Sequence, residues 1–229
     1  MNLKDKYEND KDNNIPEWLI SAMTAIGYHK LNTGIWEKIG ALIGTENSRP
    51  NGNWEYVYVF VKDRKNYTYN PIKIYNDKEL ELVKCGGQRN SDGTKTPYKL
   101  QITKPYEVFG EYTEEQKFID LIKSRNAGKD SAFIKKEYGE DHPAVYPLFL
   151  PLFYILQFSN EGDWVTDAFA GSGTTAIASL LSLRKAIAID IEPKFTNLII
   201  KRSKNLSKEF QFEPELAKIF ELNNVKIAA

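Results

Sequence analysis

The sequence predicts an α/β protein organised around a parallel strand-helix-strand unit in residues 163–193. A short apolar run at residues 164–166 stops at Asp167, and two glycines follow it, which is typical of a strand that ends in a tight loop. Apolar residues then recur at helical spacing, and a second apolar run ends at Asp190. Strand, glycine loop, helix and strand in this order form the smallest piece of a parallel sheet.

Composition excludes several classes of protein. Lysine and arginine together number 31, as do aspartate and glutamate, so the chain of 229 residues carries no net charge and any nucleic-acid surface must be local. The single Cys85 permits no internal disulfide, and His29 and His142 are too few for a conventional metal site. No apolar run is long enough to span a membrane, and the polar start lacks the core of a signal peptide. We therefore expect a cytoplasmic protein without a metal.

The first 70 residues predict a polar tail, a helix and a β-hairpin. Residues 1–14 are almost wholly polar and are expected to be frayed. Apolar residues then follow the period of a helix that Gly27 ends. Its apolar positions are Ile15, Trp18, Leu19, Ala22, Met23 and Ile26. Residues 28–38 and 54–62 are expected to be strands, the second with apolar side chains on both faces.

Between residues 71 and 141 the hydrophobic periodicity weakens. The stretch from residue 84 to residue 104 is basic, and Asp92 is its single negative residue. Its five positive residues are Lys84, Arg89, Lys95, Lys99 and Lys104. A mobile basic loop of this kind suits a phosphate backbone, and the alternative is an ordinary solvated loop. Thr113 and Gln116 fit a capping box, which predicts a helix carrying Phe118, Leu121 and Ile122.

The last part of the chain predicts two more helices around the central unit. Residues 148–158 form an apolar run of helical length, and an amphipathic helix follows Pro193. The positions that mark the second helix are Phe195, Leu198, Ile199, Arg202 and Leu206. Residues 225–228 are expected to form a last short strand.

The glycine loop has the chemistry of a ligand cradle. Glycines let the backbone approach a ligand closely, and the free N–H groups at the start of the following helix point at it. Gly171, Gly173 and Ala176 fit the dinucleotide pattern G-x-G-x-x-G/A, and Asp190 follows at about the distance of a ribose-binding acid. On spacing alone, a nicotinamide or flavin nucleotide is an alternative, and so is a plain connecting turn.

Charge at the strand end favours a different ligand. Asp167 would lie beside the cradle, where it repels a pyrophosphate and attracts a ligand that carries an ammonium and a sulfonium group. S-adenosylmethionine is such a ligand. Asp190 could accept charge-assisted hydrogen bonds from both ribose hydroxyls, each contributing roughly 1.5–3 kcal/mol.

Two motifs stand out in the last part of the chain, DAFAGSGTT at residues 167–175 and HPAVYP at residues 142–147, which leads into a helix. Together they resemble the cofactor-binding half of the DNA amino-methyltransferases, a family that methylates the exocyclic amine of adenine (N6) or cytosine (N4). Weaker similarity continues upstream through residues 54–62 to Trp18, so that the resemblance covers roughly 70% of the chain.

This resemblance implies an incomplete Rossmann-like sheet of an S-adenosylmethionine-dependent methyltransferase, with an inserted target-recognition region. It divides the chain into a polar tail (1–14), a helix and β-hairpin of the sheet (15–70), the insertion (71–141) and the cofactor-binding half (142–229). Double-stranded DNA is the partner that it implies, as in restriction-modification. The expected cofactor-binding residues are Asp167, Phe169, Gly171, Gly173, Thr174 and Asp190, with His142 and Pro143 as further candidates.

The catalytic loop of that family is absent from this sequence. In the family, an Asp, Asn or Ser, two prolines and an aromatic residue hold the target amine and stack on the flipped base. The ten prolines here are all isolated, so no catalytic residue is assigned and the chain is expected to be inactive alone. We expect a second polypeptide to carry the catalytic strand. The alternative is a non-catalytic or remnant subunit that binds cofactor or DNA and regulates a partner.

Overall fold

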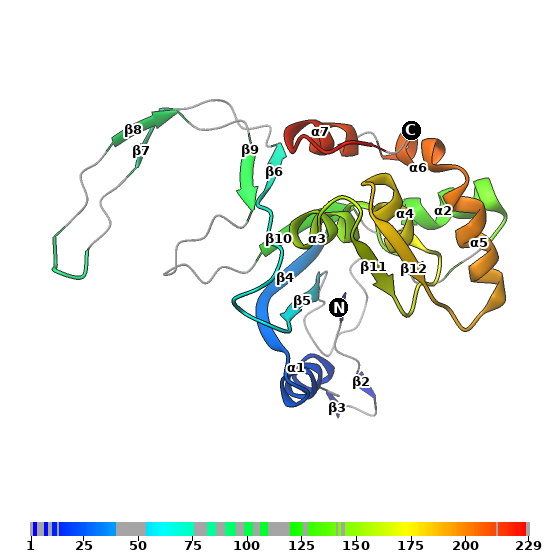
Figure 1. Ribbon diagram of the computed structural model, residues 1–229, viewed down its shortest axis with the longest axis horizontal. Coiled ribbons are helices and arrows are strands. Elements are labelled where there is room, and N and C mark those ends of the chain that lie inside the picture. The colour runs from blue at the N-terminus through cyan, green and yellow to red at the C-terminus, as the bar shows by residue number, and fades with distance from the viewer. Residues whose placement is uncertain are drawn as a thin grey trace.

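The computed structural model describes most of the chain, with the gaps concentrated before residue 145. The described residues are 2–3, 7–8, 11–12, 14–39, 54–75, 82–85, 90–94, 99–102, 106–109, 120–125, 128–140, 142, 145–213 and 215–227. They form a larger sheet of four strands, a smaller sheet of two strands and three further strand pairs, and helices pack around the two sheets (Figure 1).

The larger sheet is built on an antiparallel hairpin, as the sequence predicts. Its strand order is β1-β5-β4-β10, with β10 parallel to β4 and the other neighbours antiparallel. The bounds are β1 (Asn2–Leu3), β4 (His29–Ile39), β5 (Trp54–Val61) and β10 (Asp120–Arg125). The predicted first helix, α1 (Ile15–Ala25), precedes β4 and contacts it.

The smaller sheet is the predicted strand-helix-strand unit. β11 (Trp164–Asp167) and β12 (Lys185–Ala188) pair in parallel, and α4 (Thr174–Leu181) connects them. Asp167 lies opposite Ala188, so the two strands end side by side. The carboxyl end of this sheet carries the glycine loop and, just beyond β12, Asp190.

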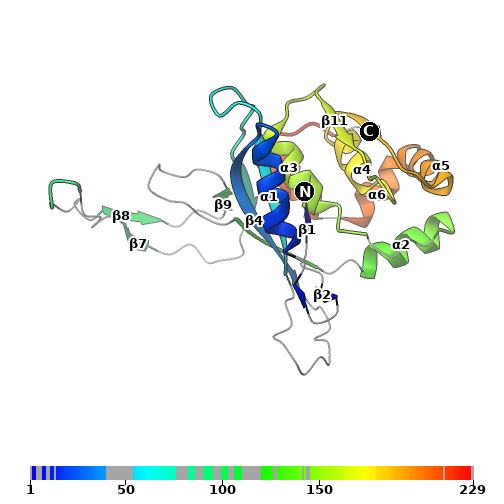
Figure 2. The same cartoon turned by 90° about the horizontal axis from the view of Figure 1, so that it is seen from below.

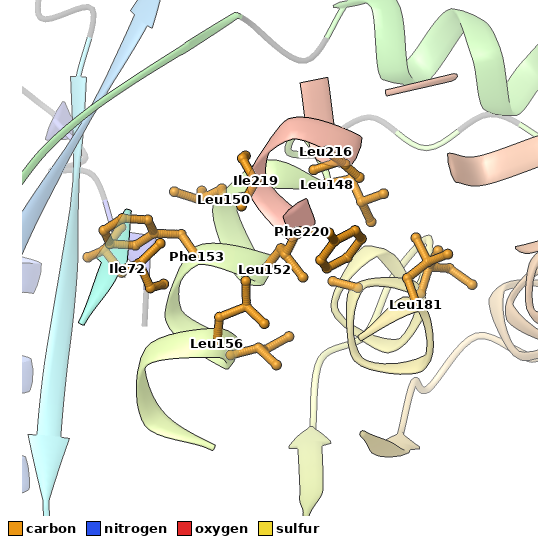
Figure 3. Packing of buried hydrophobic residues seen from close by; sticks show 14 of the residues in the cluster. Ile72, Leu148, Leu150, Leu152, Phe153, Leu156, Leu181, Leu216, Ile219 and Phe220 are labelled. Carbon is orange, nitrogen blue, oxygen red and sulfur yellow. The ribbon is translucent and has the colours of Figure 1, made fainter. Parts of the chain in front are cut away.

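The main core lies around α3 (Phe149–Phe158), which contacts α4 and lies against the hairpin. Gly34 of β4 makes close packing possible, because a Cβ atom there would overlap the Tyr154 hydroxyl. Figure 3 shows side chains of α3, α4 and α7 meeting in this core. Its fully buried members include Leu152, Phe153, Ile177, Leu181, Leu216 and Phe220.

The remaining elements surround this core or extend from it. The helices are α2 (Gly128–Tyr138), α5 (Pro193–Ser203), α6 (Leu206–Phe212) and α7 (Glu215–Leu222). Three strand pairs are β2 (Tyr7–Glu8) with β3 (Lys11–Asp12), β6 (Ile72–Tyr75) with β9 (Tyr106–Phe109), and β7 (Leu82–Cys85) with β8 (Lys99–Ile102). Figures 1 and 2 both draw the β7–β8 pair apart from the rest of the molecule.

Three sequence predictions differ from the structure. Leu121 and Ile122 lie in β10 rather than in a helix, because they find a pairing edge on β4, while Thr113, Gln116 and Phe118 lie outside the described residues. Residues 225–227 form no strand. The polar tail contributes β1 to the larger sheet, since strand pairing uses backbone groups and needs no apolar side chain.

Within the described part of the chain, no helix has both the length and the apolar character that crossing a membrane requires.

Candidate functional site

The glycine loop between β11 and α4 uses both of its glycines. Gly171 has φ +50° and Gly173 has φ +85°, in the left-handed region that side chains disfavour. A Cβ atom on Gly171 would lie 2.7 Å from His142 Nε2, and one on Gly173 would overlap Ile199. The loop is therefore pressed against the His142 segment on one side and α5 on the other.

Hydrogen bonds inside the loop fix its shape. Four loop amides donate to groups of the site itself: Phe169 N to Asp167 Oδ1 (3.0 Å), Ala170 N to Ile189 O (2.9 Å), Gly171 N to Asp190 Oδ2 (2.7 Å) and Gly173 N to Ala170 O (2.7 Å). The first helical bond of α4 runs from Ile177 N to Gly173 O (3.0 Å). The amides of residues 174–176 precede it, so the start of α4, more than the loop, offers donors to an anionic or polar ligand group.

Two carboxylates stand at the ends of the adjacent strands. Asp190 accepts from the Glu192 amide through Oδ1 (2.9 Å) and from Gly171 through Oδ2. These N–H donors, Glu192 first, lower the pKa of Asp190 below its usual range, so that it is ionised at neutral pH. Asp167 ends β11 and also receives the Tyr146 hydroxyl at 3.5 Å. The site therefore presents negative charge beside the start of a helix.

Tyr146 links three parts of the site. Its hydroxyl lies 2.6 Å from Thr175 Oγ1 as well as within reach of Asp167. Burial is the main reason that the pKa of Tyr146 rises to about 12. Sequence reasoning assigned it no role, although it lies within the motif at residues 142–147. An aromatic hydroxyl in a segment expected to face the cofactor was the available signal.

The other predicted site residues occupy different environments. The Phe169 side chain is 87% exposed, whereas Thr174 is 4% exposed and its hydroxyl lies 3.3 Å from Ser172 Oγ. The Thr174 side chain is therefore buried against Ser172 and Arg202, and its backbone amide is the group that it offers at the start of α4. The His142 ring meets the Phe195 ring edge to face at 4.5 Å. Pro143 lies outside the described residues.

A cleft of about 800 Å³ opens beside the glycine loop. It separates β5 from β11, and its walls include Tyr58, Tyr154, Trp164, Asp167 and Phe169. The volume lies within the range of small-molecule sites. Among the described residues β11 pairs with β12 alone, so its other edge borders this cleft.

The donor set fits S-adenosylmethionine. The two strand-end carboxylates suit an ammonium group and ribose hydroxyls, and the amides that open α4 suit a carboxylate. A pyrophosphate would instead meet the charges of Asp167 and Asp190. Among the described side chains, no cluster of three or more His, Cys, Asp or Glu could hold a metal ion.

Comparison with known proteins places these features in a family. A family model described as DNA methylase (N6_N4_Mtase) matches residues 7–201. The orphan methyltransferase M.BamHII of Bacillus amyloliquefaciens is 30% identical over 191 residues, which are 79% of this chain and 64% of that protein. The DNA adenine methyltransferase YhdJ of Escherichia coli K12 is 32% identical over 72% of this chain and 49% of its own length. The chain thus spans about half to two thirds of these relatives.

Solved structures share the fold. The PvuII cytosine-N4-specific DNA methyltransferase superposes with a TM-score of 0.59 at 15% identity, covering 94% of this chain and 68% of that one. The M1.HpyAVI–SAM complex superposes with a TM-score of 0.52 at 17% identity, covering 83% and 70%. These matches confirm the predicted fold class, an incomplete Rossmann-like methyltransferase sheet, and the predicted cofactor, S-adenosylmethionine, is the one that the family uses. The chain belongs to the N6/N4 DNA methylase family.

Proposed function

We propose that this chain is the S-adenosylmethionine-binding and DNA-recognition part of a site-specific DNA methyltransferase acting on adenine N6 or cytosine N4. The observation that carries the proposal is the pair of carboxylates, Asp167 and Asp190, at the end of the β11–β12 sheet, beside the start of α4. In a chain of this family, that arrangement suits S-adenosylmethionine.

Each residue of the proposed site has a distinct role. Asp167, fixed by the Phe169 amide and the Tyr146 hydroxyl, attracts the ammonium group. Asp190 uses its remaining lone pairs for the ribose hydroxyls. Phe169, exposed beside the cleft, offers an apolar surface to the adenine ring. His142 and Pro143 would border the methionine part, and when bound the cofactor supplies the methyl group.

DNA recognition is assigned to the insertion, and above all to the basic stretch. Within it β7 and β8 form a hairpin in which Cys85 lies opposite Lys99. Asn90 to Thr94 form a turn closed by the bond from Asn90 N to Thr94 O (2.7 Å). Lys95 lies outside the described residues. A basic hairpin set apart from the two sheets (Figure 2) is placed to follow a phosphate backbone.

Catalysis is assigned to a second polypeptide that carries the Pro-Pro catalytic loop. Three observations support this assignment: no two prolines are adjacent in the sequence, the cleft borders an edge of β11 that pairs with no described strand, and apolar side chains are exposed there. Trp164 and Phe169, which both line the cleft, are 64% and 87% exposed. A strand that paired with β11 would cover apolar surface and satisfy backbone groups.

A non-catalytic subunit that binds cofactor or DNA and regulates a partner is the second candidate. The same absence of adjacent prolines favours it. The two candidates differ in one respect, because only the first gains methyl transfer when the missing strand is supplied.

Transfer of a tritiated methyl group to mixed-sequence DNA tests the proposal. The chain is assayed alone and with a polypeptide that carries the family's Pro-Pro catalytic loop and its strand, either intact or with both prolines of that loop replaced by alanine. We expect incorporation only with the intact supplement. Robust incorporation by the chain alone would overturn the assignment of catalysis. Cofactor binding without incorporation under any condition would favour the regulatory subunit.

A further inference from the structure

Arg202 is a buried charge directly behind the glycine loop. It lies in the last turn of α5 and is 3% exposed. Its Nη1 donates to the carbonyl oxygen of Ser172 at 2.8 Å, and the same nitrogen lies 3.4 Å from Thr174 Oγ1. Arg202 therefore binds Ser172, the residue between the two loop glycines, and is not among the residues that line the cleft.

The rest of the guanidinium is held by Glu209 of α6. Arg202 Nε donates to Glu209 Oε1 at 2.9 Å and Nη2 to Oε2 at 2.7 Å, a bidentate pair. Glu209 is 1% exposed and also accepts the Tyr138 hydroxyl at 2.8 Å. Burial and the neighbouring Glu209 raise the pKa of Tyr138, so that it stays a donor. The chain of contacts runs from α2 through α6 and α5 to the loop.

This geometry explains why the residue is arginine. A planar guanidinium bound at two nitrogens by one carboxylate has its third nitrogen fixed in direction. That nitrogen is aimed at the Ser172 carbonyl, one residue before Gly173. Ile199, one turn earlier on α5, already contacts the position of the missing Gly173 Cβ. A lysine ammonium could keep the charge but could not make both contacts with fixed angles.

We propose that Arg202 is a positioning residue of the cofactor site. It touches no cofactor itself, and acts by holding the Ser172 carbonyl so that the glycine loop and the first amides of α4 keep the geometry that binds the cofactor. Glu209 and Tyr138 hold Arg202 in turn. This inference rests on the proposed function, because it assigns the effect to the same site.

The chain contains a matched control in Arg184. It is also buried, at 7% exposure, and also donates to backbone carbonyls, those of Ser159 (2.7 Å) and Ser182 (2.6 Å). These carbonyls lie beyond the carboxyl ends of α3 and α4, at the far end of α4 from the loop. Arg202→Lys and Arg184→Lys both remove guanidinium bonds to backbone carbonyls, Arg202→Lys also removes the bidentate bond to Glu209, and only Arg202 contacts the glycine loop.

The test measures three properties of both variants in the full chain: urea unfolding, the dissociation constant of S-adenosylmethionine, and hydrogen exchange at the Gly171 and Gly173 amides. We expect both to unfold more easily. Only Arg202→Lys should raise the dissociation constant, by roughly 10-fold or more, and accelerate exchange in the loop. Equal dissociation constants and exchange rates for the two variants would overturn the proposal.

Tyr138→Phe is the second variant, in case Arg202→Lys does not fold. It removes one bond to Glu209 and leaves the ion pair, so faster exchange at Gly171 and Gly173 is expected, and unchanged exchange would count against the proposal. Failure of the wild type to bind S-adenosylmethionine would refute the proposed function instead. The exchange rates would then still decide whether Arg202 orders the loop.

Discussion

Gly173 is required by two independent constraints, backbone conformation and packing. Its φ of +85° lies in the left-handed region, and a side chain would overlap Ile199 of α5. The sequence predicts the first constraint, because a glycine after a strand and before a helix indicates a tight turn. It could not predict the second, since the contact with α5 depends on how a later helix packs against the loop.

Replacing Gly173 by alanine should therefore destabilise the protein more than the same change at Gly162. Gly162 has a similar φ of +82°, but a Cβ atom there would have no neighbour within 4 Å. We expect Gly162→Ala to cost about 1 kcal/mol and Gly173→Ala about 2–3 kcal/mol in the free energy of unfolding. Urea denaturation measures both, and equal losses would show that Ile199 adjusts freely.

Asp190 joins the glycine loop to the end of β12, and it is free to accept further hydrogen bonds through its remaining lone pairs. Asp190→Ala should raise the dissociation constant of S-adenosylmethionine by about 10-fold or more, because the ribose bonds are lost. Asp163→Ala is the control, since Asp163 also accepts a backbone amide (Asn160 N, 2.8 Å) but precedes β11 at its other end. Calorimetry measures the dissociation constant of S-adenosylmethionine for both variants, and equal values would contradict the assignment of Asp190 to the ribose.

The elements of the central unit were predictable, and several of the surrounding ones were not. Strand, glycine loop, helix and strand stand in one window of sequence, so local pattern suffices. β10 escaped prediction because its parallel pairing with β4 joins segments far apart in the chain. α7 had a helical signal in Leu216, Ile219 and Phe220 that could have found it.

Buried charge explains the weakest part of the sequence interpretation. α6 contains Glu209, which is fully buried, and α5 contains Arg202, which the hydrophobic pattern placed merely on an amphipathic helix. A charged residue in a sequence window normally indicates a solvated face. Here the two charges neutralise each other inside the protein, a pairing that only the three-dimensional arrangement reveals. Arg202 was missed at the site for this reason, whereas Tyr146 was missed although its position within the motif at residues 142–147 offered a signal.

Burial of the Tyr146 hydroxyl, with the neighbouring charge of Asp167, predicts a pH dependence of stability. Because the folded-state pKa is about 12, against 10 in the unfolded chain, the unfolded chain ionises first as pH rises. The stabilising effect is fully present below pH 10 and is lost as pH rises toward 12. The stability advantage of wild type over Tyr146→Phe should shrink by up to about 2.7 kcal/mol across that interval. Urea unfolding of both proteins near pH 10 and near pH 12 measures this difference in unfolding free energy. A difference that stayed the same at both pH values would contradict the prediction.

At the scale of the whole molecule, the smaller sheet leaves large apolar side chains exposed in and just after its strands. Trp164 of β11 and Ile189, just after β12, are 64% and 54% exposed, whereas Val165, the next residue of β11, packs on the core. The curated relatives M.BamHII and YhdJ are longer than the part that this chain matches. The cleft borders the edge of β11 that pairs with no described strand, and this is where our proposal places the catalytic strand of a second polypeptide.

DNA binding should depend on the basic stretch that contains β7 and β8. Lys95→Glu with Lys99→Glu should lower DNA affinity and flatten its dependence on salt, because fewer counterions are released. Lys201→Glu with Lys204→Glu makes the same change of charge on α5 and the residue after it, which Figures 1 and 2 draw far from the β7–β8 pair. Fluorescence anisotropy with labelled DNA across a salt series measures the affinity of both double variants, and we expect only the Lys95 and Lys99 variant to lose affinity and salt dependence. A salt slope that the first pair leaves unchanged would show that the basic stretch is only solvated surface.

The central claim is that the glycine loop with its two strand-end carboxylates holds S-adenosylmethionine. Calorimetric titration of the wild-type chain with S-adenosylmethionine and, separately, with NAD tests it most directly. The claim predicts measurable binding of S-adenosylmethionine and weaker or no binding of NAD, because the charges of Asp167 and Asp190 oppose a pyrophosphate. Tighter binding of NAD than of S-adenosylmethionine would contradict it.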